Sequence, residues 1–121
     1  MKKKILLVED EKVIIELLEK KLKKEGYEVI LARDGEEGLA KMREEKPDLI
    51  LLDIVMPKKN GFEVLEGMMD DKRVNGTPVV IISNSGQPVE LKRAKELGVR
   101  DWLIKTEFDP QEVLDKVEKN I

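Results

Sequence analysis

Cysteine and histidine are both absent from the sequence. Without them the chain has no thiolate nucleophile, no zinc site of the usual kinds, no Ser-His-Asp triad and no phosphohistidine of its own. Any chemistry must therefore come from Asp, Glu, Lys, Ser and Thr side chains.

The sequence also lacks an excess of charge of one sign and any long apolar run. Its 23 Lys and Arg residues are balanced by 26 Asp and Glu residues, a net charge of −3, so direct binding of nucleic acid is not expected. The basic start is followed only by the apolar run Ile5–Val8, which is too short for a signal peptide or a membrane span. We expect a cytoplasmic protein without membrane insertion, folded as one domain over residues 1–121.

Short apolar runs alternate with longer charged stretches of helical periodicity, which indicates βα repeats. The predicted strands are Ile5–Val8, Tyr27–Ala32, Leu49–Leu52, Pro78–Ile82 and Trp102–Ile104. The predicted helices are Glu11–Glu25, Glu36–Glu44, Gly61–Met69, Pro88–Leu97 and Pro110–Lys119. Gly26 and Gly98 are typical helix stops.

Two of these strands, Ile5–Val8 and Leu49–Leu52, show no polar alternation. Strands of this kind are covered by helices on both faces, which requires a mainly parallel sheet. We therefore predict an α/β fold, a doubly wound (βα)5 sheet of the flavodoxin-like order 2-1-3-4-5. Ligands of such sheets bind beyond the carboxyl ends of the strands, where the winding direction reverses. In this order that point lies between the first and third strands.

Acidic residues follow directly on those two strands: Glu9 and Asp10 after the first, and Asp53 after the third. Like charges at one sheet edge repel and raise one another's proton affinity, so such a group usually needs a cation. An all-oxygen group suits a hard ion such as Mg²⁺. The sequence therefore predicts a metal-dependent site that handles phosphate.

The next two strands place a hydroxyl and an ammonium at the same edge, because Ser83 follows Ile82 and Lys105 follows Ile104. These groups can stabilise the oxygens of a phosphoryl group on Asp53. Each residue also has a plainer interpretation on its own: Asp10 as a helix cap, Glu9 as a solvated acid, Ser83 as a turn residue and Lys105 as a surface charge.

Taken together, the motifs resemble those of a response regulator receiver domain of two-component signalling, of the single-domain, chemotaxis-regulator kind. The motifs are LLVEDE, which holds Glu9 and Asp10, then LLDIVMPKKNG with Asp53, IIS with Ser83, and DWLIK with Lys105. Their order and spacing cover essentially the whole chain.

The resemblance implies that Asp53 accepts a phosphoryl group from a histidine kinase, a histidine phosphotransfer protein or a small donor such as acetyl phosphate. It assigns Mg²⁺ to Glu9, Asp10, Asp53 and the main-chain carbonyl of Val55. Lys105 would neutralise charge on the transferring group. Such a domain assists its own phosphorylation and dephosphorylation, so we expect a signalling protein rather than an enzyme.

In proteins of this kind a hydroxyl and an aromatic residue form a switch, and the matching positions here are Ser83 and Trp102. Trp102 replaces the usual Tyr or Phe, and its alternative interpretation is an anchor packed between the last two helices. Thr106 stands where a proline usually follows the lysine, so we expect a trans Lys105–Thr106 peptide.

Other phosphate-handling proteins fit less well. A haloacid dehalogenase would need an Asp at the position of Val55. A flavodoxin would need a hydroxyl-rich loop after the first strand, where this chain has Glu9, Asp10 and Glu11. P-loop and dinucleotide enzymes would need their glycine motifs, which do not occur in this sequence. Two alternatives stay open: a non-phosphorylated pseudo-receiver that acts as a scaffold, and the receiver of a larger regulator.

If the chain acts alone, its output passes through contacts with a downstream protein. The resemblance places that contact on the face around Leu91, Lys95, Trp102 and Val113. It places docking of the histidine-bearing partner on the first helix.

Overall fold

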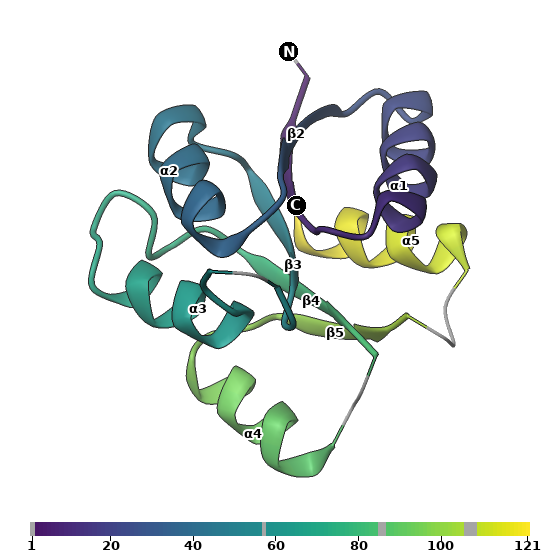
Figure 1. The fold of residues 1–121 in the computed structure, drawn as a ribbon. Coiled ribbons are helices and arrows are strands. Elements are labelled where there is room, and N and C mark those ends of the chain that lie inside the picture. Colours follow the sequence, from purple (N-terminus) through teal and green to yellow (C-terminus); the bar gives the residue numbers. More distant parts are fainter. Residues whose placement is uncertain (1, 57, 85–86, 106–108) are drawn as a thin grey trace.

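The computed structural model describes residues 2–56, 58–84, 87–105 and 109–121. Within these ranges, five parallel strands alternate with five helices (Figure 1). The strands are β1 (Lys4–Val8), β2 (Glu28–Ala32), β3 (Leu49–Asp53), β4 (Val79–Ser83) and β5 (Asp101–Ile104). The helices are α1 (Lys12–Lys24), α2 (Gly35–Glu45), α3 (Gly61–Met69), α4 (Pro88–Glu96) and α5 (Pro110–Asn120). The strand order β2-β1-β3-β4-β5 confirms the predicted fold.

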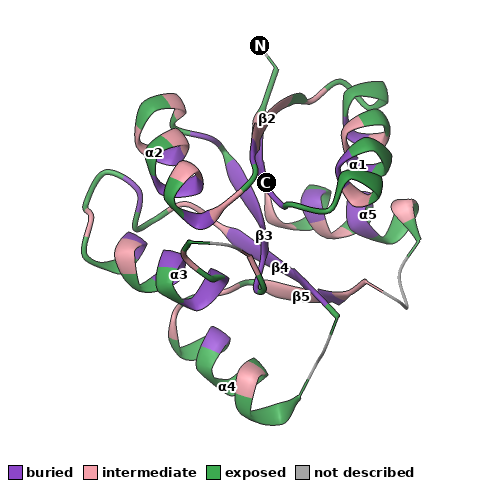
Figure 2. Cartoon of the chain, in the orientation of Figure 1, coloured by how far each residue is buried: buried purple, intermediate pink, exposed green. Residues whose placement is uncertain are grey.

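The sheet separates two hydrophobic clusters, as helices on both faces require. Helices α1 and α5 cover one face and helices α2, α3 and α4 cover the other (Figure 1). Their buried side chains belong to the two clusters. All five residues of β3 and of β4 are buried (Figure 2), which explains why Leu49–Leu52 shows no polar alternation. Among the described residues, no helix combines the length and the apolar character that crossing a membrane requires.

Local capping signals explain where the helices begin and end. Asp34 and Asn60 accept hydrogen bonds from backbone N–H groups in the first turns of α2 and α3, at 2.8 and 2.9 Å. Gly26 and Gly98 have φ values of 93° and 88°, which lets the chain leave α1 and α4 without steric strain. Every predicted boundary lies within one residue of the observed one, and Gly61–Met69 agrees at both ends.

The sheet register brings the ends of the strands to one edge. Val8 is paired with Leu52, so the next residues, Glu9 and Asp53, come side by side. Ser83 is paired with Ile104, and the Lys105 N–H donates to the Ser83 carbonyl at 2.7 Å. Glu9, Asp53, Ser83 and Lys105 therefore share the carboxyl edge of the sheet, at the reversal of winding between β1 and β3.

The loop between β3 and α3 is held closely against the start of α2. A Cβ atom on Gly35 would overlap the Lys59 carbonyl oxygen and lie 2.6 Å from the Lys59 Cβ, so only glycine allows this approach. Asp34 Oδ2 lies 3.7 Å from Lys58 Nζ and forms a second link. Lys58 and Lys59, which precede α3, are thus positioned by the β2–α2 turn.

Candidate functional site

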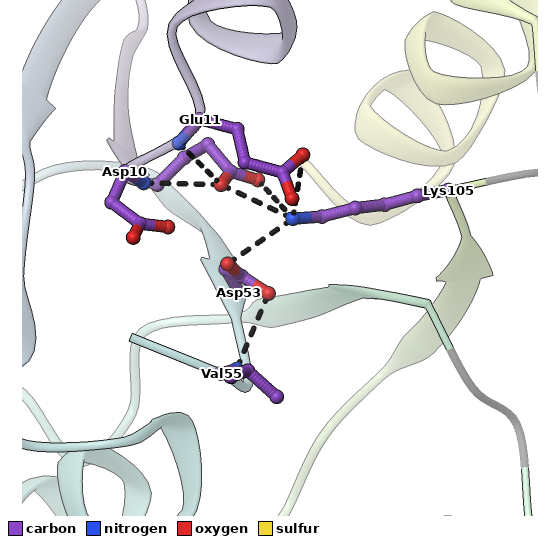
Figure 3. A network of polar contacts seen from close by, with 6 residues as sticks. Asp10, Glu11, Asp53, Val55 and Lys105 are labelled. Carbon is purple, nitrogen blue, oxygen red and sulfur yellow. Dashed lines mark hydrogen bonds and ion pairs between the residues drawn. The ribbon is translucent and has the colours of Figure 1, made fainter. Parts of the chain in front are cut away.

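Three carboxylates meet at this edge of the sheet. Glu9, Asp10 and Asp53 each offer an oxygen atom, and these atoms all lie within 4.8 Å of one another. Figure 3 shows two of the three, Asp10 and Asp53, with Lys105. Glu9 and Asp53 are buried, at 0% and 3% exposure, whereas Asp10 is exposed. The predicted acidic group is therefore assembled, with one member open to solvent.

A single ammonium group reaches into this acidic group from the end of β5. Lys105 Nζ lies 2.8 Å from Glu9 Oε1, 3.1 Å from Asp53 Oδ2 and 3.5 Å from Glu11 Oε2. The Lys105 side chain is only 4% exposed. The interpretation of Lys105 as a surface charge is therefore wrong.

Backbone groups fix the orientation of the two buried acids. Glu9 Oε2 accepts hydrogen bonds from the N–H groups of Asp10 and Glu11, both at 3.0 Å, and Asp53 Oδ1 accepts one from Val55 N–H at 3.4 Å. The alternative role of Asp10 as the cap of α1 is wrong, because the N-cap residue is Glu11.

Burial perturbs the protonation of the site. Loss of solvation outweighs the hydrogen bond from Lys105 and raises the pKa of Glu9 to about 7. Burial likewise raises the pKa of Asp53 despite the attraction of Lys105. Burial alone would lower the pKa of Lys105, but its bond to Glu9 and the charge of Asp53 prevail and raise that pKa. Lys105 thus stays cationic while the acids hold protons more tightly than usual.

The predicted switch residues lie on the two strands β4 and β5. Ser83 is buried at the end of β4. Trp102 is half-buried on β5 and packs against the cluster on the α4 side of the sheet, with Leu97 and Val99. Its alternative interpretation, an anchor between the last two helices, stays open.

The face expected to report to a downstream protein is present only in part. A cavity of about 250 Å³ is lined by Leu91, Lys95 and Trp102, among other residues of α4 and β5. Val113, in contrast, is buried beneath α5 at 1% exposure. Including Val113 in this face was wrong, because it belongs to the core stripe of its helix. The Lys105–Thr106 peptide lies outside the described residues.

Comparison with known proteins accounts for this arrangement. A family model described as the response regulator receiver domain matches residues 5–118. The chain belongs to the response regulator receiver family. The receiver is a signalling domain of two-component systems, as the motifs predicted.

Three similar proteins illustrate the relationship. The alkaline phosphatase synthesis transcriptional regulatory protein PhoP of Bacillus subtilis (strain 168) is 41% identical over 117 residues, which cover 97% of this chain and 48% of PhoP. The chemotaxis protein CheY4 of Vibrio cholerae is 30% identical with a TM-score of 0.93, and each chain is covered completely. The phosphorylated cyanobacterial phytochrome response regulator RcpA is 34% identical with a TM-score of 0.84, covering 98% of this chain and 91% of that one. The receiver thus spans about half the length of the curated relative.

The acidic group of this receiver suits a divalent cation. Glu9 Oε1 is buried and receives no hydrogen bond from any described residue, although it lies 2.8 Å from Lys105 Nζ. Carboxylate oxygens are the ligands that Mg²⁺ prefers. A cation at this place would supply charge that a single lysine cannot.

Among the described residues, Glu11 contacts Lys105 although no motif assigns it a role. It directly follows the acid pair and occupies the N-cap of α1, so its position in the sequence was the available signal. Its contact with Lys105, however, depends on the placement of β5 beside that helix end.

Proposed function

We propose that this receiver accepts a phosphoryl group on Asp53 in a Mg²⁺-dependent reaction and signals through contacts with other proteins. The donor is a histidine kinase or a histidine phosphotransfer protein. The observation that carries the proposal is the placement of Asp53, a buried carboxylate 3.1 Å from Lys105 Nζ and grouped with Glu9 and Asp10. A buried acid needs such partners to act as an anionic nucleophile.

In the proposed transfer, an oxygen of Asp53 attacks the phosphorus of a phosphohistidine in line with the breaking P–N bond. The histidine nitrogen leaves with the electron pair of that bond, and Asp53 becomes an acyl phosphate. The ammonium of Lys105 donates hydrogen bonds to the phosphoryl oxygens, because its Nζ lies 3.1 Å from Asp53 Oδ2 and so within reach of a group on that oxygen.

The residues that would hold the ion are Glu9, Asp10, Asp53 and the main-chain carbonyl of Val55. When bound, the ion neutralises charge on the transferring phosphoryl group.

The response to phosphorylation is assigned to Ser83 and Trp102. In the proposal, the Ser83 hydroxyl donates to the phosphoryl group and Trp102 changes its packing against the α4 side of the sheet. A downstream protein would detect the change at the cavity lined by Leu91, Lys95 and Trp102. The proposal includes a cytoplasmic location and no direct contact with nucleic acid.

A pseudo-receiver that serves only as a scaffold is the weaker alternative. Such a protein need not retain the acidic group and its lysine, whereas Glu9, Asp10, Asp53 and Lys105 lie together here. The similar receiver RcpA is described in its phosphorylated form, which supports the same chemistry in this chain.

The test is incubation with acetyl phosphate and Mg²⁺ followed by intact-protein mass spectrometry. We expect one phosphoryl adduct in the wild type and none in Asp53→Asn or in excess EDTA. The matched control is Asp48→Asn, an exposed acid at the opposite end of β3, which should be labelled as well as the wild type. An adduct that persists in Asp53→Asn refutes the assignment.

A second proposal concerns the setting of the domain. The curated relative is a transcriptional regulatory protein about twice as long as the matched region, which favours a receiver that controls a further domain. Sequencing the transcript on both sides of this segment distinguishes that arrangement from a protein that acts alone.

A further inference from the structure

Glu11 places a further carboxylate against the lysine of the site. Its Oε2 lies 3.5 Å from Lys105 Nζ, and its side chain is about half exposed, at 49%. Figure 3 shows the Glu11 carboxylate turned toward Lys105 rather than along its own helix. Lys105 therefore faces carboxylates of Glu9, Asp53 and Glu11 with one positive charge.

The local sequence does not explain why a glutamate stands at this position. Glu11 is the N-cap of α1, yet its side chain makes no capping hydrogen bond. Asn, Asp, Ser and Thr are preferred at N-caps because their shorter side chains reach the free N–H groups of the first turn. A residue that breaks such a local rule is often kept for function, and here the contact it makes is the one with Lys105.

The three acids in contact with Lys105 differ in what else they can do. Glu9 and Asp53 belong to the group that suits a divalent cation, and both are buried. Glu11 is not in that group and lies at the solvent side of the lysine. It can therefore hold Lys105 even when the other two acids have a cation as their partner.

We propose that Glu11 is a positioning residue that holds Lys105 toward the start of α1 and restrains phosphorylation of Asp53. The proposal rests on the proposed function. When Asp53 is phosphorylated, the Lys105 ammonium must give up its contact with Glu11 to bind the phosphoryl oxygens. The contact with Glu11 therefore favours unphosphorylated Asp53. Small anionic donors, which bring no protein contacts to offset this cost, are restrained most.

The variant Glu11→Gln removes the charge but keeps the length of the side chain. Like the glutamate, glutamine is not among the preferred capping residues. Loss of a half-exposed ion pair supports a rate increase of roughly twofold to fivefold with acetyl phosphate at saturating Mg²⁺. Because salt screens a partly buried pair in part, the ratio of variant to wild-type rate should decrease as KCl rises. Affinity for beryllofluoride, measured by calorimetry with Mg²⁺, should rise by a similar factor.

Two further variants separate contact from charge and from helix stability. Glu11→Asp keeps the charge but shortens the side chain by one methylene, so it should match Glu11→Gln if contact with Lys105 is responsible. Because Asp can also cap α1, the unfolding midpoint of this variant is measured beside its rate. Glu16→Gln removes an exposed acid of the same helix that lies 4.0 Å from Lys12, and it should match the wild type.

The outcomes decide the inference. Faster phosphorylation and tighter beryllofluoride binding in both Glu11 variants support it. If Glu11→Asp is phosphorylated at the wild-type rate while Glu11→Gln is phosphorylated faster, the negative charge of residue 11 simply repels the anionic donor. That result overturns the positioning role. A phosphorylated wild type with unchanged Glu11 variants overturns the inference alone, whereas a wild type that takes no phosphoryl group overturns the proposed function as well.

Discussion

Replacing Glu9 by Gln should stabilise the receiver in the absence of divalent cations. Glu9 is fully buried, and its pKa is raised from 4.5 to about 7 by burial. The folded state therefore binds this proton more tightly than the unfolded chain does. Glutamine is neutral like the protonated acid, and its amide oxygen can still accept the two backbone hydrogen bonds that reach Glu9 Oε2. Its amide NH₂ then takes the place of Oε1, 2.8 Å from Lys105 Nζ, so Lys105 has to turn toward Asp53 in the variant.

The sign of the effect follows from linkage. For an acid with a raised pKa in the folded state, the stability associated with its proton is present below pH 4.5 and is lost as the pH rises to about 7. The shift corresponds to a penalty on the order of 2 to 3 kcal/mol for the ionised Glu9 at pH 8. For a chain of 121 residues, each kcal/mol moves the unfolding midpoint by about 4 °C. Glu9→Gln should therefore unfold roughly 10 °C higher than the wild type at pH 8.

The assay is thermal and urea unfolding of both proteins in EDTA at pH 5, 6, 7 and 8. The difference in unfolding free energy should be smallest at pH 5, where only a minor part of the penalty is present, and should grow to its full value by pH 8. In millimolar Mg²⁺ the difference in unfolding free energy between the two proteins should shrink or change sign. The wild type gains stability from binding the ion, whereas the variant has lost one of the ligands.

A matched control is Glu16→Gln, since Glu16 is exposed and its ion pair with Lys12 spans 4.0 Å. This variant should change the free energy of unfolding by less than about 0.5 kcal/mol at any pH. If Glu9→Gln is no more stable than the wild type at pH 8 in EDTA, or if its advantage does not vary with pH, the argument from burial is refuted.

Two further predictions test the surroundings of the site. In a urea titration, Gly35→Ala should lower the free energy of unfolding by roughly 1 to 3 kcal/mol, because the added Cβ would overlap Lys59. The control Gly76→Ala has no atom within 4 Å of the added Cβ and should be neutral or slightly stabilising. Trp102 is the only tryptophan, so beryllofluoride with Mg²⁺ should change its emission or its quenching by iodide, and Ser83→Ala should reduce that signal more than it reduces phosphorylation; an unchanged signal in the wild type counts against the switch.

The fold and most of the site follow from short-range patterns in the sequence. Runs such as Leu49–Leu52 identify buried strands, and the acids that end them mark one sheet edge once the strands are parallel. What the sequence does not specify is the direction of individual side chains. The cap of α1 lies one residue beyond the predicted Asp10, and the link from Glu11 to Lys105 depends on how β5 and α1 meet. Val113 was placed on the surface although its spacing along α5 marks it as core.

The ion pair between Glu9 and Lys105 also has a consequence for the order of assembly. The two residues are 96 positions apart, so a chain made from its N-terminus exposes Glu9 and Asp53 well before Lys105 is synthesised. A nascent sheet of β1 to β4 would have to bury both acids with no ammonium between them, which is strongly unfavourable. Lys105, which follows the last strand, therefore supplies the positive charge that allows the carboxyl ends of β1 and β3 to pack with Glu9 and Asp53 buried. Native packing of the acidic edge has to await β5, and a ribosome-bound chain that lacks it should remain open there.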